Sequence, residues 1–169
     1  MAIIKELNGY MPKFGENCFL ADNAVVVGEV EMGDDCSIWF GAVLRGDVHY
    51  IKIGSKVNIQ DNATVHGTYK KSPTTIGNNV SIAHNAVVHG CTIHDNVLIG
   101  MGAVVLDDAV IESNAIVAAG SVVTKGTVVE SGWVYAGIPA KKMKQVGEEL
   151  LNNEIIRIVE SYSMYASWY

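Results

Sequence analysis

Aliphatic residues recur every six positions along most of this chain. Each copy begins with an aliphatic residue, passes through polar or turn-forming residues, and has a small residue at its fifth position. This period fits neither a helix of roughly 3.6 residues per turn nor an alternating strand. It predicts very short strands that turn a corner in every copy, so that three copies close a triangular coil and successive coils stack. Copies begin at Phe14, Leu20, Val26, Met32, Ile38, Leu44, Ile53, Ile59, Val65, Ile76, Ile82, Val88, Ile93, Ile99, Val105, Ile111, Val117 and Val123.

The residues between the copies support a triangular prism. Gly, Asn and Asp stand where corners are expected, for example at Asn79 and Asp108, and Gly and Asn tolerate a left-handed backbone. Loops are predicted along one edge of the prism, because every departure from the six-residue spacing follows the third copy of a coil. The departures are Leu44 to Ile53, Val65 to Ile76 and Val88 to Ile93.

The C-terminal region follows a different pattern. The six-residue repeat becomes irregular after Val129, and Gly137 and Pro139 interrupt it. We predict an α-helix over residues 140–167 whose apolar stripe packs along the outside of the prism. The chain is therefore expected to be one mainly β domain over 1–169, with a lead-in at 1–13 and a β-helix at 14–135. The stripe consists of Val146, Leu150, Leu151, Ile155, Ile158, Val159, Tyr162 and Tyr165.

Composition agrees with a folded domain and excludes several function classes. The chain is 49% apolar and 18% charged over 169 residues, enough for a substantial core. Its formal net charge of -6 argues against nucleic-acid and anionic-membrane partners, which require a basic face. The basic cluster Lys141, Lys142 and Lys144 is expected at the solvated start of the helix.

The location of the protein is also inferred from the sequence. No apolar run approaches the roughly 20 residues that span a bilayer, so no transmembrane helix is predicted. The N-terminal segment lacks the apolar region of a signal peptide, and the cysteines lack a disulfide-framework spacing. We therefore expect a cytoplasmic protein with reduced cysteines, of which Cys36 and Cys91 are structural.

The repeat sorts the histidines into columns. Arg45, His66 and His89 directly follow the inward aliphatic residue of third copies, so they stack on one face about 4.8 Å apart. Two imidazoles one coil apart can converge on zinc. Gln60, Asp61 and His84 follow the inward residue of second copies and belong to another face. His94 lies on the first face and is interpreted as an ordinary surface histidine.

A third metal ligand requires a second subunit. His84 cannot easily reach around the prism edge, and presentation of His84 by a neighbouring subunit predicts a cyclic homotrimer with sites between subunits. If the third face of one subunit meets the second face of the next, Arg45 lies near a neighbouring Asp61, and Gln60 lies near the metal. Such an Arg–carboxylate pair fixes register more than it adds stability.

The repeat resembles the left-handed parallel β-helix of hexapeptide-repeat proteins, and the handedness is implied by that resemblance. A closer resemblance, to γ-class carbonic anhydrases and their relatives, covers nearly the whole chain. The motifs that carry it are Arg45-Gly46-Asp47, Asn58-Ile59-Gln60-Asp61, Val65-His66 and His84-Asn85-Ala86-Val87-Val88-His89-Gly90.

The resemblance implies a function and a set of residue roles. His66 and His89 of one subunit, with His84 of another, would bind Zn²⁺, or Fe²⁺ or Co²⁺. A metal-bound hydroxide would then convert CO2 reversibly to bicarbonate, which is a lyase reaction. Among the remaining site residues, Gln60 would orient the metal-bound water, Arg45 and Asp61 would support the interface, Asp47 would belong to the same network, and Tyr165 would enter the site from the C-terminal helix.

The chain departs from the best-known active form at its proton shuttle. Val48 replaces a glutamate, and the loop from Gly67 to Thr75 contains no acid. Tyr69, His49 or Tyr165 would have to carry the proton, and several relatives with this shortened pattern are weak or silent in CO2 hydration. The sequence therefore supports metal binding better than fast catalysis.

Two other functions remain open from the sequence. Many hexapeptide-repeat proteins are acetyl-CoA-dependent acyltransferases, which use one histidine as a general base and need a long groove for the pantetheine arm. The same histidines could also serve a metal-binding trimer with no catalytic role.

Overall fold

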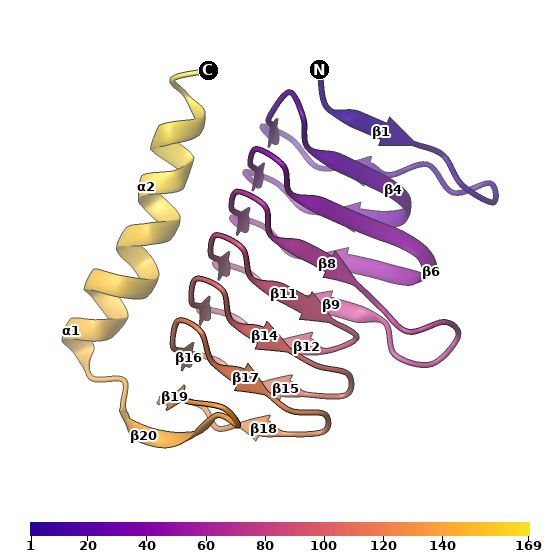
Figure 1. Ribbon diagram of the computed structural model, residues 1–169. Coiled ribbons are helices and arrows are strands. Elements are labelled where there is room, and N and C mark those ends of the chain that lie inside the picture. The colour runs from indigo at the N-terminus through magenta and orange to yellow at the C-terminus, as the bar shows by residue number, and fades with distance from the viewer.

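The computed structural model describes residues 1–169 and contains a parallel β-solenoid with a helical segment beside it (Figure 1). The second face of the prism is one sheet of short parallel strands, and it confirms the predicted mainly β fold. Its strands are β3 (Phe19–Leu20), β5 (Ser37–Ile38), β7 (Asn58–Ile59), β10 (Ser81–Ile82), β13 (Leu98–Ile99), β16 (Ile116–Val117) and β19 (Trp133–Ala136).

The first and third faces join into a second sheet, because two long strands run around the edge between them. The long strands are β4 (Val25–Met32) and β6 (Val43–Ile53). The first face adds β2 (Lys13–Phe14), β9 (Thr74–Ile76), β12 (Thr92–Ile93), β15 (Val110–Ile111) and β18 (Val128–Val129). The third face adds β1 (Ile3–Lys5), β8 (Thr64–His66), β11 (Val87–His89), β14 (Val104–Val105) and β17 (Val122–Val123).

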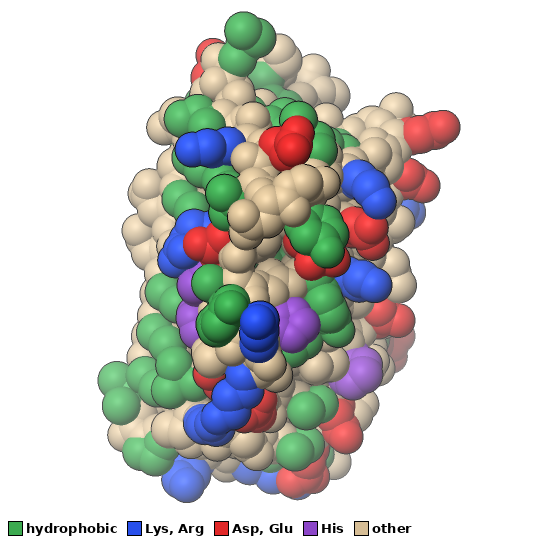
Figure 2. Space-filling model, turned by 90° about the vertical axis from the view of Figure 1, so that its right-hand side faces the viewer, with side chains coloured by type: hydrophobic (Ala, Val, Ile, Leu, Met, Phe, Trp, Pro, Cys, Tyr) green, Lys and Arg blue, Asp and Glu red, His purple; other side chains and the backbone are tan.

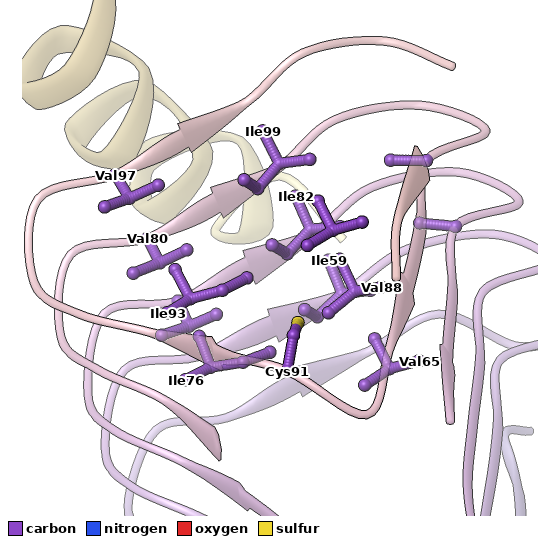
Figure 3. Close-up of a cluster of buried hydrophobic side chains, with 14 of the residues drawn as sticks. Ile59, Val65, Ile76, Val80, Ile82, Val88, Cys91, Ile93, Val97 and Ile99 are labelled. Carbon is purple, nitrogen blue, oxygen red and sulfur yellow. The ribbon is translucent and has the colours of Figure 1, made fainter. Parts of the chain in front are cut away.

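Stacked aliphatic side chains form the core. Ile59 is paired with Ile82 on the second face, and Val65 is paired with Val88 on the third. The inward column of each face therefore repeats from coil to coil, and 33 buried residues form one continuous cluster (Figure 3). Burial of a branched aliphatic side chain contributes about 1.5–3 kcal/mol, which explains why the first position of each copy is so restricted.

Asparagine side chains organise one corner of the prism. Asn79, Asn96 and Asn114 all have a positive φ. The chain adopts this left-handed backbone at the corner that follows the first-face strand of each of these coils. The Asn79 side-chain amide donates to Asn96, and the Asn96 amide donates to Asn114, each at 3.1 Å. The corner is therefore held by a ladder of amides as well as by backbone conformation.

The edge between the third and first faces differs in part from the prediction. The nine-residue interval from Leu44 to Ile53 is continuous strand β6, and it pairs with β4 through a register shift between Gly28 and Val30. The interval after β8 does contain a loop, closed by an isolated bridge between Thr68 and Ser72.

The solenoid continues beyond the last predicted copy, and the start of the helix differs from the prediction. Val129 pairs with Ile111, and Tyr135 pairs with Val117, so a further turn follows the last predicted copy. Residues predicted to begin the helix form strand β20 (Lys141–Gln145), which pairs antiparallel with β19 and covers that strand's edge. The basic cluster lies on this strand, and the helical segment begins at Glu148 instead of residue 140.

The helical segment runs back along the stack toward the first coils, so the two chain ends lie at the same end of the stack (Figure 1). It comprises α1 (Glu148–Leu150), the π-helical turn η1 (Leu151–Ile156) and α2 (Arg157–Ala166). Ile155 is buried against Ile116 and Val134 of the second face, as the apolar stripe predicted. No helix is both long enough and apolar enough to cross a membrane.

Candidate metal centre

Strands β8 and β11 place two histidines side by side. His66 and His89 are register partners at the ends of these strands. Nδ1 of His66 lies 3.1 Å from Nε2 of His89, and the ring planes are inclined by 63°. The predicted column is therefore present. Strands β8 and β11 run away from the helical segment (Figure 1), and the surface on that side carries histidine side chains among acidic and basic ones (Figure 2).

Carboxylates fix the proton positions of both rings. Nε2 of His66 lies 2.9 Å from Asp47, and Nδ1 of His89 lies 2.6 Å from Asp107. An ionised carboxylate only accepts hydrogen bonds, so each of these nitrogens carries a hydrogen. In the neutral rings, the two nitrogens that face each other are then both lone-pair acceptors. Two acceptors at this distance repel unless a proton or a metal cation lies between them.

The pKa values of both carboxyl groups support this assignment. Partial burial raises the pKa of Asp47, but hydrogen bonds from His66 and Arg45 outweigh it and hold the pKa below its ordinary value. Burial likewise opposes ionisation of Asp107, whereas hydrogen bonds from Thr68 and His89 lower its pKa overall. Both side chains are therefore ionised at neutral pH.

The two facing nitrogens fit a zinc site. Nitrogens bound to one tetrahedral Zn²⁺ at about 2.0–2.1 Å lie roughly 3.3 Å from each other. The observed separation of 3.1 Å is close to this value. Carboxylates on the outer nitrogens of zinc-binding histidines are a common arrangement that orients the rings. Within one chain, however, no three His, Cys, Asp or Glu side chains converge to hold a metal ion.

His84 lies apart from this pair, in the turn between β10 and β11. Its Nδ1 is 2.8 Å from Asp61, and its Nε2 is 3.1 Å from the hydroxyl of Tyr162 on α2. Burial raises the pKa of Tyr162 to about 12, with further contributions from Asp61 and Tyr165, so the hydroxyl is protonated. The hydroxyl therefore donates to His84 Nε2, which is a lone-pair acceptor like the facing nitrogens of the other two histidines.

A cavity of about 420 Å³ lies between the second face and the helical segment. Its lining includes the polar Gln60, His84, Tyr162 and Tyr165 and the charged Glu154 and Arg157, and most of the other lining residues are apolar. Gln60 is buried and donates through its amide to Asn58 at 2.9 Å. This geometry leaves the amide oxygen of Gln60 as an acceptor for a small molecule.

The remaining predicted site residues divide between the two locations. Arg45 is paired with Asp47 of its own chain, and Asp61 is paired with His84. Tyr165 does not bond to His84; its ring packs edge-on against Tyr162 at a centroid distance of 5.4 Å. The exposed His94 belongs to neither location.

Sequence reasoning missed two residues of these networks, Tyr162 and Asp107. Tyr162 belongs to the apolar stripe that the helical period identified, three positions before Tyr165, and its polar contact was not anticipated. Asp107 comes two positions after the inward Val105 of the next coil, so the register did place it one turn from His89. Its acidic character next to a predicted metal ligand was the signal available.

Comparisons with known proteins agree with the fold and with the hexapeptide-repeat family. The sequence profile described as bacterial transferase hexapeptide (six repeats) matches residues 11–46 and 90–125. A carbonic anhydrase of Geobacillus kaustophilus is 39% identical, with 99% of this chain and 91% of that protein covered. Gamma carbonic anhydrase 2, mitochondrial, of Arabidopsis thaliana is 46% identical, and the match covers 91% of this chain and 56% of that protein.

Solved structures with a similar fold carry other names. A Bacillus cereus protein described as a proposed acetyltransferase has a TM-score of 0.96 and 34% identity, with 99% of this chain and 96% of that chain covered. A hexapeptide transferase family protein from Anaplasma phagocytophilum has a TM-score of 0.94 and 39% identity, with 99% and 98% covered. Carbonic anhydrase and transferase names thus both occur among the relatives.

Proposed function

The chain belongs to the hexapeptide-repeat family that includes proteins named gamma carbonic anhydrase, and on this basis we propose that it is a metal-dependent CO2 hydratase. The proposed enzyme is a homotrimer that converts CO2 reversibly to bicarbonate at sites between subunits. His66 and His89 of one subunit and His84 of the next would hold the metal, which is Zn²⁺, or Fe²⁺ or Co²⁺.

The main structural support for this proposal is that His66 and His89 point lone pairs toward each other. They lie 3.1 Å apart, at a separation that suits two ligands of one cation. His84 presents a third lone pair, also set by a carboxylate, at a different edge of the third face. One chain thus has three candidate metal ligands, but they lie in two separate places. This supports completion of the site by a neighbouring subunit.

The residues around the site suit this chemistry. The three neutral imidazoles would hold the cation, which would supply Lewis-acid chemistry and lower the pKa of a water at the site to about 7. Asp47, Asp107 and Asp61 keep the three rings in the tautomers that bind a cation. Gln60 offers an acceptor beside His84, and the apolar walls of the cavity suit a small uncharged substrate such as CO2.

Proton release is the step that this chain supports least. The loop from Gly67 to Thr75 contains no acid, as the sequence indicated. A cavity of about 340 Å³ beside Asp47 is lined by His49, Tyr69 and Glu29. These side chains are candidates to pass a proton to buffer, and we expect turnover to be low and to depend on buffer concentration.

The decisive experiment combines metal analysis, solution mass and a CO2 hydration assay on protein purified without chelator and then loaded with Zn²⁺ or Fe²⁺. We expect a trimer that binds one metal ion per subunit and hydrates CO2. His84→Ala should abolish metal binding and activity and leave the trimer intact. His94→Ala is the matched control, because His94 is an exposed histidine outside both networks, and it should behave like the wild type.

Two results would refute parts of this proposal. A monomer in solution would exclude sites shared between subunits. A trimer that binds metal but hydrates no CO2 in either metal form would leave a metal-binding trimer without hydratase activity, which is the non-catalytic alternative.

A second candidate function is acyl transfer from acetyl-CoA. The observation in its favour is that solved structures at 34% and 39% identity carry transferase names. This chemistry needs one histidine base and no metal. Turnover of acetyl-CoA by metal-free protein would therefore favour transferase activity over hydration, and its absence in the presence of candidate amine and hydroxyl acceptors would count against it.

A further inference from the structure

A carboxylate from the coil beyond His89 holds that histidine in place. Asp107 lies in the corner between β14 and β15, and its Oδ1 accepts from His89 Nδ1 at 2.6 Å. Its other oxygen accepts a hydrogen bond from the Thr68 hydroxyl at 2.5 Å. Both oxygens are engaged, and the side chain is only 20% exposed. Asp107 is therefore fixed from two sides, unlike a solvated corner aspartate.

We propose that Asp107 is a positioning residue for the metal centre, which fixes the Nδ1–H tautomer of His89 so that Nε2 presents its lone pair toward His66. This inference rests on the proposed metal-dependent function. Which nitrogen of an imidazole is free to bind a cation depends on the hydrogen bond made by the other nitrogen. Without Asp107, His89 could carry its hydrogen on Nε2, where it would exclude a cation.

Thr68 extends this arrangement into the loop between β8 and β9. The Thr68 hydroxyl binds Asp107, and the Ser72 hydroxyl binds the neighbouring Asp108 at 2.6 Å. Both bonds connect the loop to the same corner, but only the first continues to a histidine. The Thr68 bond restricts Asp107 to the orientation in which its other oxygen meets His89.

Asp108 provides a matched control. It follows Asp107 in the same turn, accepts from Ser72, and lies 3.4 Å from the Lys125 ammonium. It contacts no histidine, and its positive φ of 61° is one that asparagine tolerates. Asp107→Asn and Asp108→Asn therefore each remove one carboxylate charge from the same corner, but only the first replaces the carboxylate that faces His89 with an amide, which can donate to Nδ1 as well as accept from it.

The experiment measures two properties of each variant. Long-range ¹H–¹⁵N NMR of the metal-free protein reports which nitrogen of His89 carries the hydrogen, and competition with a chelator reports the affinity for Zn²⁺. We expect the Nδ1–H tautomer in the wild type and in Asp108→Asn. Asp107→Asn should show a mixture of tautomers and roughly 10- to 100-fold weaker Zn²⁺ binding, as is typical when the carboxylate behind a metal-binding histidine is lost.

Unchanged tautomer and Zn²⁺ affinity in Asp107→Asn would overturn the proposal, and so would an equal loss in Asp108→Asn, which would indicate a general effect on the corner. If Asp107→Asn does not fold, Thr68→Val tests the same link. This variant removes the bond that orients Asp107, and it should shift the His89 tautomer in the same direction; an unchanged tautomer would overturn the proposal. If the wild type binds no Zn²⁺, the metal-dependent function fails, whereas the NMR result still decides whether Asp107 sets the tautomer.

Discussion

At the residue scale, the hydroxyl of Tyr162 is hydrogen-bonded to Nε2 of His84, the nitrogen that a metal ion would bind. It lies 3.1 Å from Nε2 in the single chain. A metal ion that binds Nε2 must displace this hydrogen bond, which is worth roughly 0.5–1.5 kcal/mol to the metal-free state. We therefore predict that Tyr162→Phe raises the affinity for Zn²⁺ about 2- to 12-fold, measured by competition with a chelator.

Tyr165→Phe is the control for this prediction. Tyr165 lines the same cavity but makes no hydrogen bond to His84, so its replacement should leave Zn²⁺ affinity unchanged. Weaker binding by Tyr162→Phe would contradict the prediction, because it would mean that the hydroxyl orients His84 in the metal-bound state. A change in Tyr165→Phe of similar size would indicate a general effect on the cavity.

A buried thiol gives a prediction that depends on pH. Burial raises the pKa of Cys36 to about 12. Because the folded pKa lies above the unfolded one, the contribution of the thiol to stability is complete below the ordinary pKa of about 8.5 and is lost as the pH rises through about 12.

In native protein near neutral pH, Cys36 should resist alkylation, whereas the partly exposed Cys18 should react faster. Mass spectrometry of alkylated peptides would measure both rates, and equal rates would contradict this reading.

The residues of the site were predictable to different degrees. The six-residue register was sufficient to place His66 and His89 in one column and His84 outside it. The register could not predict that Asp47 and Asp107 contact the two histidine rings, because those contacts depend on side-chain orientations around a corner. The resemblance pointed to Tyr165, which lines the same cavity, whereas the hydroxyl that contacts His84 in one chain belongs to Tyr162, three positions earlier on the helix.

At the element scale, the asparagine ladder can be tested apart from the aliphatic core. Asn96 bonds to Asn79 and Asn114 and has a φ of 56°. Asn96→Ala removes both bonds and places alanine in the left-handed region, at a cost of roughly 2–4 kcal/mol in the free energy of unfolding. Asn96→Gly removes the same bonds without the backbone penalty and should be less destabilising.

Urea unfolding monitored by circular dichroism would compare the two variants. A larger loss in Asn96→Gly than in Asn96→Ala would show that backbone conformation at this corner matters less than we expect. Equal midpoints for both variants and the wild type would show that the ladder contributes nothing measurable.

The elements after the repeat show where prediction by periodicity ends. The apolar stripe from Val146 onward correctly indicated a helix packed on the prism. Strand β20 was missed because all five of its residues are exposed, so it carries no apolar signal. Strand β20 forms because the edge of β19 would otherwise be unpaired. An unpaired edge arises only in the assembled solenoid, so no local sequence pattern predicts the strand that covers it.

At the scale of the whole molecule, one chain holds the three proposed metal ligands in two separate places. His66 and His89 lie at the end of the third face, and His84 lies at the turn where that face begins. Their lone pairs can meet around one cation only if another copy brings its His84 to the pair. The proposed trimer would therefore have three equivalent sites, and each subunit would contribute to two of them.

Mixing two inactive variants tests this sharing directly. A His84→Ala chain keeps the His66–His89 pair, and a His66→Ala chain keeps His84. When both are co-expressed in equal amounts, random assembly of cyclic trimers leaves roughly a quarter of all sites with a complete set of ligands. We predict that metal content and CO2 hydration return to about that fraction of the wild-type values, whereas each variant alone stays near zero. A mixture that is no better than its separate components, although mass measurements show mixed trimers, would mean that the three histidines do not serve a shared site.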